Sequence, residues 1–141
     1  IVLEQDMALR DIVESGVRIN GEVSKEILLT VFHDNTMLHD GAAVIANNRL
    51  VAAGCILPLT EQQELSKILG MRHRAALGLS EAADAIIVIV SEETGTLSVA
   101  RNGKLQQRVD PKDLEAMLYQ LYRSKAEKTL LRKAARPEPV A

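Results

Sequence analysis

Apolar and polar residues alternate along this chain in segments that predict strands separated by helices. The apolar segments that predict strands are 1–3, 42–46, 50–57, 85–90, 96–101 and 104–109. Segment 85–90 is apolar throughout, which is typical of a strand buried on both faces of a sheet. Asn47-Asn48 and Asn102-Gly103 lie between consecutive segments and predict hairpin turns.

Helix signals lie between these segments. The expected starts are Ser24 as an N-cap, Gly70 before a helix over 72–82, and Asp110 as an N-cap with Pro111 at the first helical position. The sequence Thr60–Gln63 resembles a capping box and predicts a short helix. Two further stretches are read differently: 7–14 mixes apolar and charged residues and is predicted as an extended edge or a loop, and Asn20-Gly21 predicts a break.

The order of these elements predicts a single α/β domain in which a mixed sheet is flanked by helices on both faces. A length of 141 residues fits one domain, and a hydrophobic content of 47% is enough for a core. We place the domain at residues 1–122 and expect 123–141 to form a basic helix extension and a disordered tail.

Composition excludes several classes of protein. The net charge of −2 and an aromatic content of 2% argue against a nucleic-acid partner. Cys55 is the only cysteine, so no intrachain disulfide forms, a cytoplasmic setting is expected, and the residue is predicted to be small and buried. No segment reaches the roughly 18 apolar residues of a membrane span. Because Ile1 opens an apparent strand, we expect further sequence upstream.

One segment that could bear chemistry is Leu38–Ala43. The Asp40 carboxylate stands beside His39 and is followed by Gly41 and Ala42, so a ligand could lie against the backbone there. A divalent cation suits such a carboxylate. The alternative is an aspartate that caps its own turn.

A second segment is Gly70–Ala76, where Arg72 and Arg74 flank His73 at a predicted helix start. Guanidinium groups and free N–H groups at a helix N-terminus favour a polyphosphate. The alternative is a pair of solvated arginines, with His73 in a structural role. A carboxylate for a metal and an arginine pair for phosphates are both parts that phosphoryl transfer needs.

With Asn35-Thr36 upstream and Ser91–Gly95 downstream, the motifs LHDGA and RHRAALGLSE resemble the diadenylate cyclase domain family over about Val17–Val109. The resemblance implies an α/β sandwich around a mixed sheet. It implies a nucleotidyltransferase that condenses two ATP molecules into cyclic di-AMP and two pyrophosphates. The motifs look closest to the membrane-type members of the family.

The resemblance also implies roles for individual residues. Asp40 matches the catalytic metal-binding carboxylate, His39 a further metal ligand, and Arg72 and Arg74 the catalytic pair that holds the triphosphate. The implied cofactor is a divalent cation: Mn²⁺, Mg²⁺ or Co²⁺. The residues matched to substrate contacts are Gly41, Ala42, Leu57, Met71, Arg72, His73, Arg74, Ser91 and Glu93. Three positions depart from the family pattern and bear on nucleotide affinity: Met37, Ile56 and Met71.

Partners follow from the same resemblance. We expect ATP as substrate, cyclic di-AMP as product, and a homodimer or higher homo-oligomer in which two domains face each other. Upstream helices would anchor the parent protein to the bacterial cell membrane and could meet a membrane regulatory protein. Two alternatives stay open: a nucleotide or cyclic-dinucleotide binding module without turnover, and a small α/β adaptor.

Overall fold

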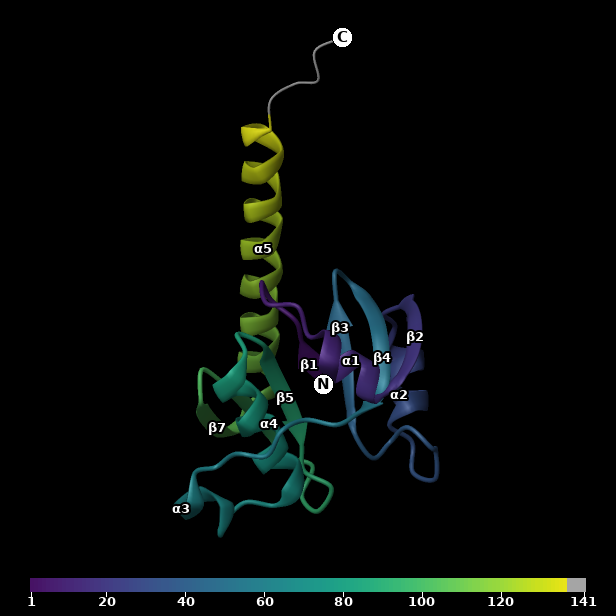
Figure 1. Ribbon diagram of the computed structural model, residues 1–141, viewed down its shortest axis with the longest axis vertical. Coiled ribbons are helices and arrows are strands. Elements are labelled where there is room, and N and C mark those ends of the chain that lie inside the picture. The colour runs from purple at the N-terminus through teal and green to yellow at the C-terminus, as the bar shows by residue number, and fades with distance from the viewer. Residues whose placement is uncertain (137–141) are drawn as a thin grey trace. The chain divides into compact units, whose positions relative to one another are not determined.

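The computed structural model describes residues 1–136 and divides into two compact units, residues 1–108 and a second unit that begins at Val109 (Figure 1). The elements in chain order are β1 (Val2–Leu3), α1 (Arg10–Ser15), β2 (Val17–Glu22), α2 (Lys25–Val31), β3 (Ala42–Ala46), β4 (Arg49–Cys55), α3 (Gln63–Ser66), α4 (Met71–Ala82), β5 (Ile86–Val90), β6 (Leu97–Arg101), β7 (Lys104–Val109) and α5 (Pro111–Ala135).

The strands form one seven-stranded sheet in the order β2-β4-β3-β1-β5-β6-β7. The short strand β1 stands between the two halves of the sheet: Val2 pairs in parallel with Val44 of β3 and in antiparallel fashion with Ile87 of β5. The β2–β4, β3–β4 and β5–β6 pairs are antiparallel. The predicted mixed sheet is confirmed.

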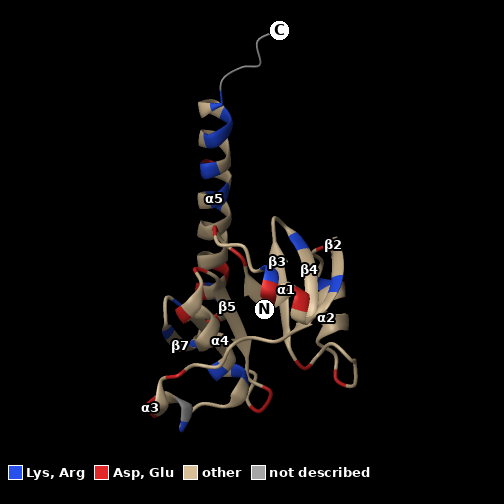
Figure 2. Ribbon diagram, in the orientation of Figure 1, with Lys and Arg blue, Asp and Glu red and all other residues tan. Residues whose placement is uncertain are grey.

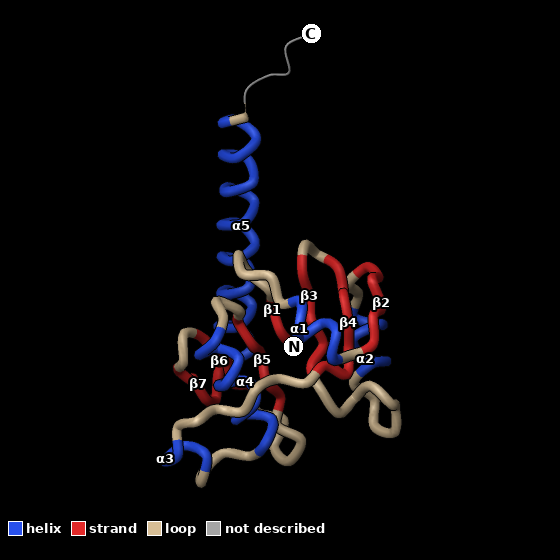
Figure 3. The backbone as a smooth tube through the Cα atoms, in the orientation of Figure 1, coloured by secondary structure: helices blue, strands red, loops and turns tan. Residues whose placement is uncertain are grey.

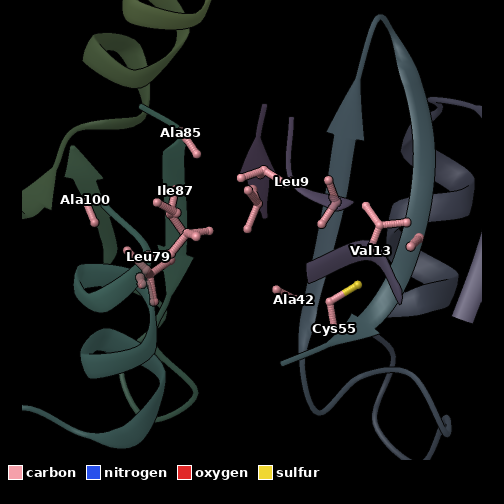
Figure 4. Close-up of a cluster of buried hydrophobic side chains, with 13 residues drawn as sticks. Leu9, Val13, Ala42, Cys55, Leu79, Ala85, Ile87 and Ala100 are labelled. Carbon is pink, nitrogen blue, oxygen red and sulfur yellow. The ribbon is translucent and has the colours of Figure 1, made fainter. Parts of the chain in front are cut away.

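Side chains alternate across the sheet and build two clusters. On one face, the cluster holds Val44 of β3, Ile87 of β5 and Leu79 of α4, together with Val13 of α1 and Leu9, which caps that helix (Figure 4). On the other face, the neighbouring β3 residue Ala43 packs with Leu50, Ala53 and Val31, the last of these from α2. Helices therefore cover both faces, as predicted.

Several local signals act as expected. The Ser24 hydroxyl accepts the N–H of Ile27 at 3.1 Å and caps α2. Asn47 and Asn48 have φ angles of 51° and 61°, and Asn102-Gly103 has 52° and 73°, so both tight turns use the left-handed conformation that short hairpins need. The Asp110 carboxylate caps α5 ahead of Pro111.

The prediction for 7–14 was wrong, because α1 occupies Arg10–Ser15. Leu9 and Val13 are one helical turn apart, and both are buried, so burial against the sheet stabilises this helix. The charged residues around them interrupt the apolar pattern that would have predicted it. The break predicted at Asn20-Gly21 was also wrong. There β2 continues through an irregularity between Arg18 and Gly21, in which Asn20 adopts a φ of 49°.

The predicted capping box does not form. Helix α3 follows as expected, but its N-cap is Gln62, which makes no side-chain cap bond. The Thr60 hydroxyl instead donates to the Glu81 carboxylate of α4 at 2.6 Å. The same hydroxyl keeps a local bond as well, because it accepts the N–H of Gln62 at 3.1 Å.

Helix α5 is continuous from Pro111 to Ala135, and its second half is rich in Lys and Arg (Figure 2). The predicted domain boundary after residue 122 remains a prediction, and the predicted disordered tail falls largely on 137–141, outside the described residues. Among the described helices, none is both long enough and apolar enough to cross a membrane.

Candidate functional site

The sheet brings the predicted site segments to one edge. Strand β3 runs parallel to β1, while β4 and β5 run antiparallel to these strands. The start of β3 and the ends of β4 and β5 therefore share an edge, so that Asp40, Leu57 and Ser91 lie on neighbouring loops (Figure 3). Strands β3 and β5 are two strand spacings apart, roughly 10 Å.

Gly41 positions the Asp40 loop on the sheet. Its φ of 144° is one that residues with a side chain rarely adopt, and an added Cβ would lie 2.8 Å from the carbonyl carbon of Gly54. The lack of a side chain at Gly41 therefore has a packing cause in addition to the predicted approach of a nucleotide. The Ala42 side chain lies in the core, which leaves only its main chain to meet a ligand.

His39 and Asp40 form a pair at the head of this loop. His39 Nδ1 lies 2.7 Å from the carbonyl oxygen of Thr36, and His39 Nε2 lies 3.2 Å from Asp40 Oδ1. Because a carbonyl oxygen only accepts, the proton is assigned to Nδ1. In the neutral ring, Nε2 then carries a lone pair that faces a carboxylate oxygen.

Two acceptors that face each other fit a divalent cation. Imidazole nitrogen and carboxylate oxygen suit Mn²⁺ and Co²⁺, and the carboxylate suits Mg²⁺. The Asp40 carboxylate is 81% exposed, so it is accessible to such an ion. No group of three or more His, Cys, Asp or Glu side chains with metal-binding geometry exists within residues 1–136, so further ligands would come from water or phosphate.

Arg72 is fixed to the end of β5. Its Nη1 donates to the carbonyl oxygen of Val90 at 3.0 Å, and its Nη2 donates to the Glu92 carboxylate at 2.6 Å. Each terminal nitrogen uses one of its two N–H groups in these bonds, which orient the planar guanidinium. Remaining donors of the guanidinium stay available at the site edge.

Arg74 has a donor without a partner. Its Nε is buried and makes no hydrogen bond to any of the described residues. A buried donor without an acceptor is costly, and because the atom is closed to solvent a phosphate oxygen would meet it only after the Arg74 side chain moved. Both main-chain polar groups of Arg74 are hydrogen-bonded. Its N–H donates to the carbonyl oxygen of Gly70 at the start of α4, and its carbonyl oxygen accepts the N–H of Thr60.

The remaining predicted residues surround these charges. Burial, and secondarily the Arg72 charge, lower the pKa of His73 below 6.5, which favours the neutral ring. Ser91 closes a turn in which its carbonyl oxygen accepts from Gly95 at 2.9 Å, while Glu93 is exposed. Leu57 is half-buried against the core, and Met71 is 64% exposed.

The departures Met37 and Ile56 are exposed to 97% and 72%. Apolar side chains this open contribute no packing within the chain. Their predicted effect on nucleotide affinity remains a prediction.

Two contributors were missed in the sequence. Glu92 lies between the predicted Ser91 and Glu93, and it is Glu92 that contacts Arg72. Gly78 lies inside RHRAALGLSE, where an added Cβ would be 1.9 Å from the carbonyl oxygen of Pro58. A glycine inside a helix lowers the stability of that helix. Its presence at position 78 was therefore the sequence signal for a close backbone contact.

Comparison with known proteins identifies the family and the fold. Residues 1–105 match the DAC family model, described as the DisA bacterial checkpoint controller nucleotide-binding domain. The chain is 48% identical to the cyclic di-AMP synthase CdaA of Bacillus subtilis over 118 residues, and 42% identical to a diadenylate cyclase of Listeria monocytogenes. In both cases the match covers 84% of this chain and 43% of the relative.

Solved structures extend the similarity to the fold. DacA from Staphylococcus aureus, crystallised as a double mutant, has a TM-score of 0.82 at 43% identity, covering 86% of this chain and 81% of that one. A hypothetical membrane-spanning protein from Bacillus cereus has a TM-score of 0.73 at 43% identity, covering 77% and 53%. The sheet, the converging motifs and these matches together establish that the chain belongs to the DAC domain family of diadenylate cyclases.

Proposed function

We propose that this domain is a diadenylate cyclase that condenses two ATP molecules into cyclic di-AMP and two pyrophosphates. The observation that carries the proposal is the convergence of the Asp40 loop, the start of α4 and the end of β5 on one sheet edge. That edge presents a carboxylate–imidazole pair near guanidinium groups. The relatives named above are described as cyclic di-AMP synthases or diadenylate cyclases.

Asp40 and His39 would hold the divalent cation through Oδ1 and Nε2, which lie 3.2 Å apart. When bound, such an ion makes a nearby hydroxyl more acidic and polarises phosphoryl oxygens. With the proton of His39 assigned to Nδ1, beside the Thr36 carbonyl, the lone pair of Nε2 would be directed to the ion.

Arg72 and Arg74 would hold the triphosphate and stabilise the departing pyrophosphate. The 3′-oxygen of each ATP forms a bond to the α-phosphorus of the other, the α–β phosphoanhydride bond breaks, and the hydroxyl proton leaves. Two such steps close the ring. No protein nucleophile takes part, so positioning and charge supply the catalysis.

The other predicted substrate contacts keep their proposed places around the nucleotide. Leu57 would meet the adenine through its main chain, and Ser91 and Glu93 would lie toward the phosphates. Because each domain would bind one ATP, two domains would face each other across this edge. The product is made between them, and the working unit is a homodimer or a larger homo-oligomer.

The chain spans less than half the length of the curated relatives it matches. We infer for the parent protein an anchor in the bacterial membrane, which the similarity to a membrane-spanning protein of Bacillus cereus supports. A membrane regulatory partner belongs to the same inference. The anchor is tested by locating the full-length parent in cell fractions, and the partner by identifying membrane proteins that co-purify with it.

The activity is tested by incubating the protein with ATP and Mn²⁺, Mg²⁺ or Co²⁺ and separating the nucleotides by chromatography. The expected result is cyclic di-AMP with two pyrophosphates for each molecule formed. ATP binding without product would support the binding module instead. Absence of ATP binding in calorimetry would support the adaptor.

A further inference from the structure

Residues 56–62, here called the bridge segment, connect the two halves of the candidate site. The segment begins after Cys55, which pairs with Ala42 beside the Asp40 loop. Further along, the Thr60 N–H donates to the carbonyl oxygen of Arg74 at 3.0 Å. The bridge segment therefore runs from the end of β4, beside the carboxylate loop, to α4 (Figure 3).

The bridge segment is held on α4 by side chains away from the predicted chemistry. Thr60 is only 5% exposed, and its hydroxyl donates to Glu81 Oε1 at 2.6 Å while accepting the N–H of Gln62 at 3.1 Å. The Gln62 amide also donates to Glu81 Oε1 at 2.6 Å. Both bonds have the short length that is typical of hydrogen bonds to an ionised carboxylate.

Gly78 allows the contact in between. A Cβ at this position would lie 1.9 Å from the Pro58 carbonyl oxygen and 2.6 Å from the Leu59 carbonyl carbon. Arg74, Gly78 and Glu81 follow the i, i+4, i+7 spacing of one helix face. Residues 58–62 of the bridge segment thus meet one face of α4, at Arg74, Gly78 and Glu81, while the N–H of Ile56 at its start donates to the Ser15 hydroxyl.

We propose that Thr60 and Glu81 are positioning residues for nucleotide binding. They fix the bridge segment along α4, and so hold Leu57 and the Arg74 turn in the relative placement that the nucleotide needs. The proposal rests on the proposed function for the identity of the ligand. Glu81 itself touches neither base nor phosphate, because its carboxylate is engaged by Thr60 and Gln62, about two helical turns beyond Arg74.

The test uses Thr60→Val, which keeps the shape and removes the hydroxyl, and Glu81→Gln, which keeps the size and removes the charge. Each should raise the KM for ATP by about fivefold while kcat changes less than about twofold. Each should also narrow the preference for ATP over GTP, because the base-facing segment loses its fixed position. The double variant should resemble the single variants, since both disrupt one interaction.

Ser24→Ala is the matched control, because Ser24 caps α2 on the opposite face of the sheet. It should lower the melting temperature and leave KM and nucleotide preference unchanged. The proposal is overturned if Thr60→Val and Glu81→Gln behave like this control at a temperature where all variants are folded.

Failure of the proposed function gives a different result. If the wild type binds ATP but makes no cyclic di-AMP, calorimetric affinities for ATP and GTP replace KM in the same comparison. A fivefold loss of ATP affinity in both variants would still support the bridge segment's role. If the wild type binds no ATP, both proposals are overturned.

Discussion

At the scale of single residues, Asp40 is predicted to matter most. Asp40→Asn keeps the shape but is a poor ligand for a hard divalent cation, so cyclic di-AMP formation should fall by about a hundredfold or more. The carboxylate is 81% exposed, so the fold should keep its melting temperature. Turnover near the wild-type rate in Mn²⁺ or Mg²⁺ would place the metal elsewhere.

The arginines should act on binding. Arg72→Ala or Arg74→Ala each removes charge-assisted hydrogen bonds worth roughly 1.5–3 kcal/mol, or about tenfold to a hundredfold in ATP affinity. Calorimetric titration measures this loss. Arg101→Ala, an exposed arginine at the end of β6, is the control and should leave the affinity unchanged. Equal ATP affinities in all variants would mean that Arg72 and Arg74 are solvated arginines that do not bind phosphate.

His73 predicts a dependence of stability on pH. Its folded pKa lies below its ordinary value of 6.5, so the unfolded chain binds more protons between the two values. The free energy of unfolding should therefore fall as the pH drops through that window, and His73→Gln should remove this contribution. Urea unfolding at pH 7.5 and 5.5 measures it, and identical pH dependence in both proteins would contradict it.

The sequence indicates which charged residues belong to the candidate site, but not which residues contact them. Asp40, Arg72 and Arg74 are identifiable because charged groups stand beside residues with little side chain. The contact between Arg72 and Glu92 depends on where β5 ends relative to α4, which no local pattern encodes. The packing role of Gly41 likewise depends on Gly54, thirteen positions along the chain on β4.

At the scale of elements, Gly78→Ala should disturb both stability and binding. The added methyl would collide with the Pro58 carbonyl, a backbone atom that cannot turn away, so a cost of about 1–3 kcal/mol or more is expected. ATP affinity should fall with it. Gly70→Ala is the control in the same region, because its added Cβ meets nothing within 4 Å. Chemical denaturation of the two variants compares them, and equal stability would contradict the close contact.

Elements with strong local signals are the ones that could be predicted. Apolar runs, the Asn-Gly turn and the Asp110-Pro111 start are decided within a few residues. Helix α1 was not predicted because its stability comes from burial of Leu9 and Val13 against strands far along the chain. The Thr60 capping box does not form, because the Thr60 hydroxyl accepts the N–H of Gln62 and donates to Glu81, which lies 21 positions along the chain.

At the scale of the whole molecule, the order of elements predicts the α/β class but not the strand order. Strand β1 is two residues long, yet it joins the halves of the sheet through Val2. This junction brings the start of β3 and the end of β5 to one edge. The candidate site is therefore a product of topology, and only the resemblance to a family links its parts before the structure is known.

The central claim is that each domain holds one ATP and that cyclic di-AMP is made between two domains. Specific activity across a dilution series, with the oligomeric state followed by light scattering, tests it most directly. The rate should rise faster than linearly with enzyme concentration until dimers predominate. Constant specific activity in protein that light scattering shows to be monomeric throughout would contradict the claim.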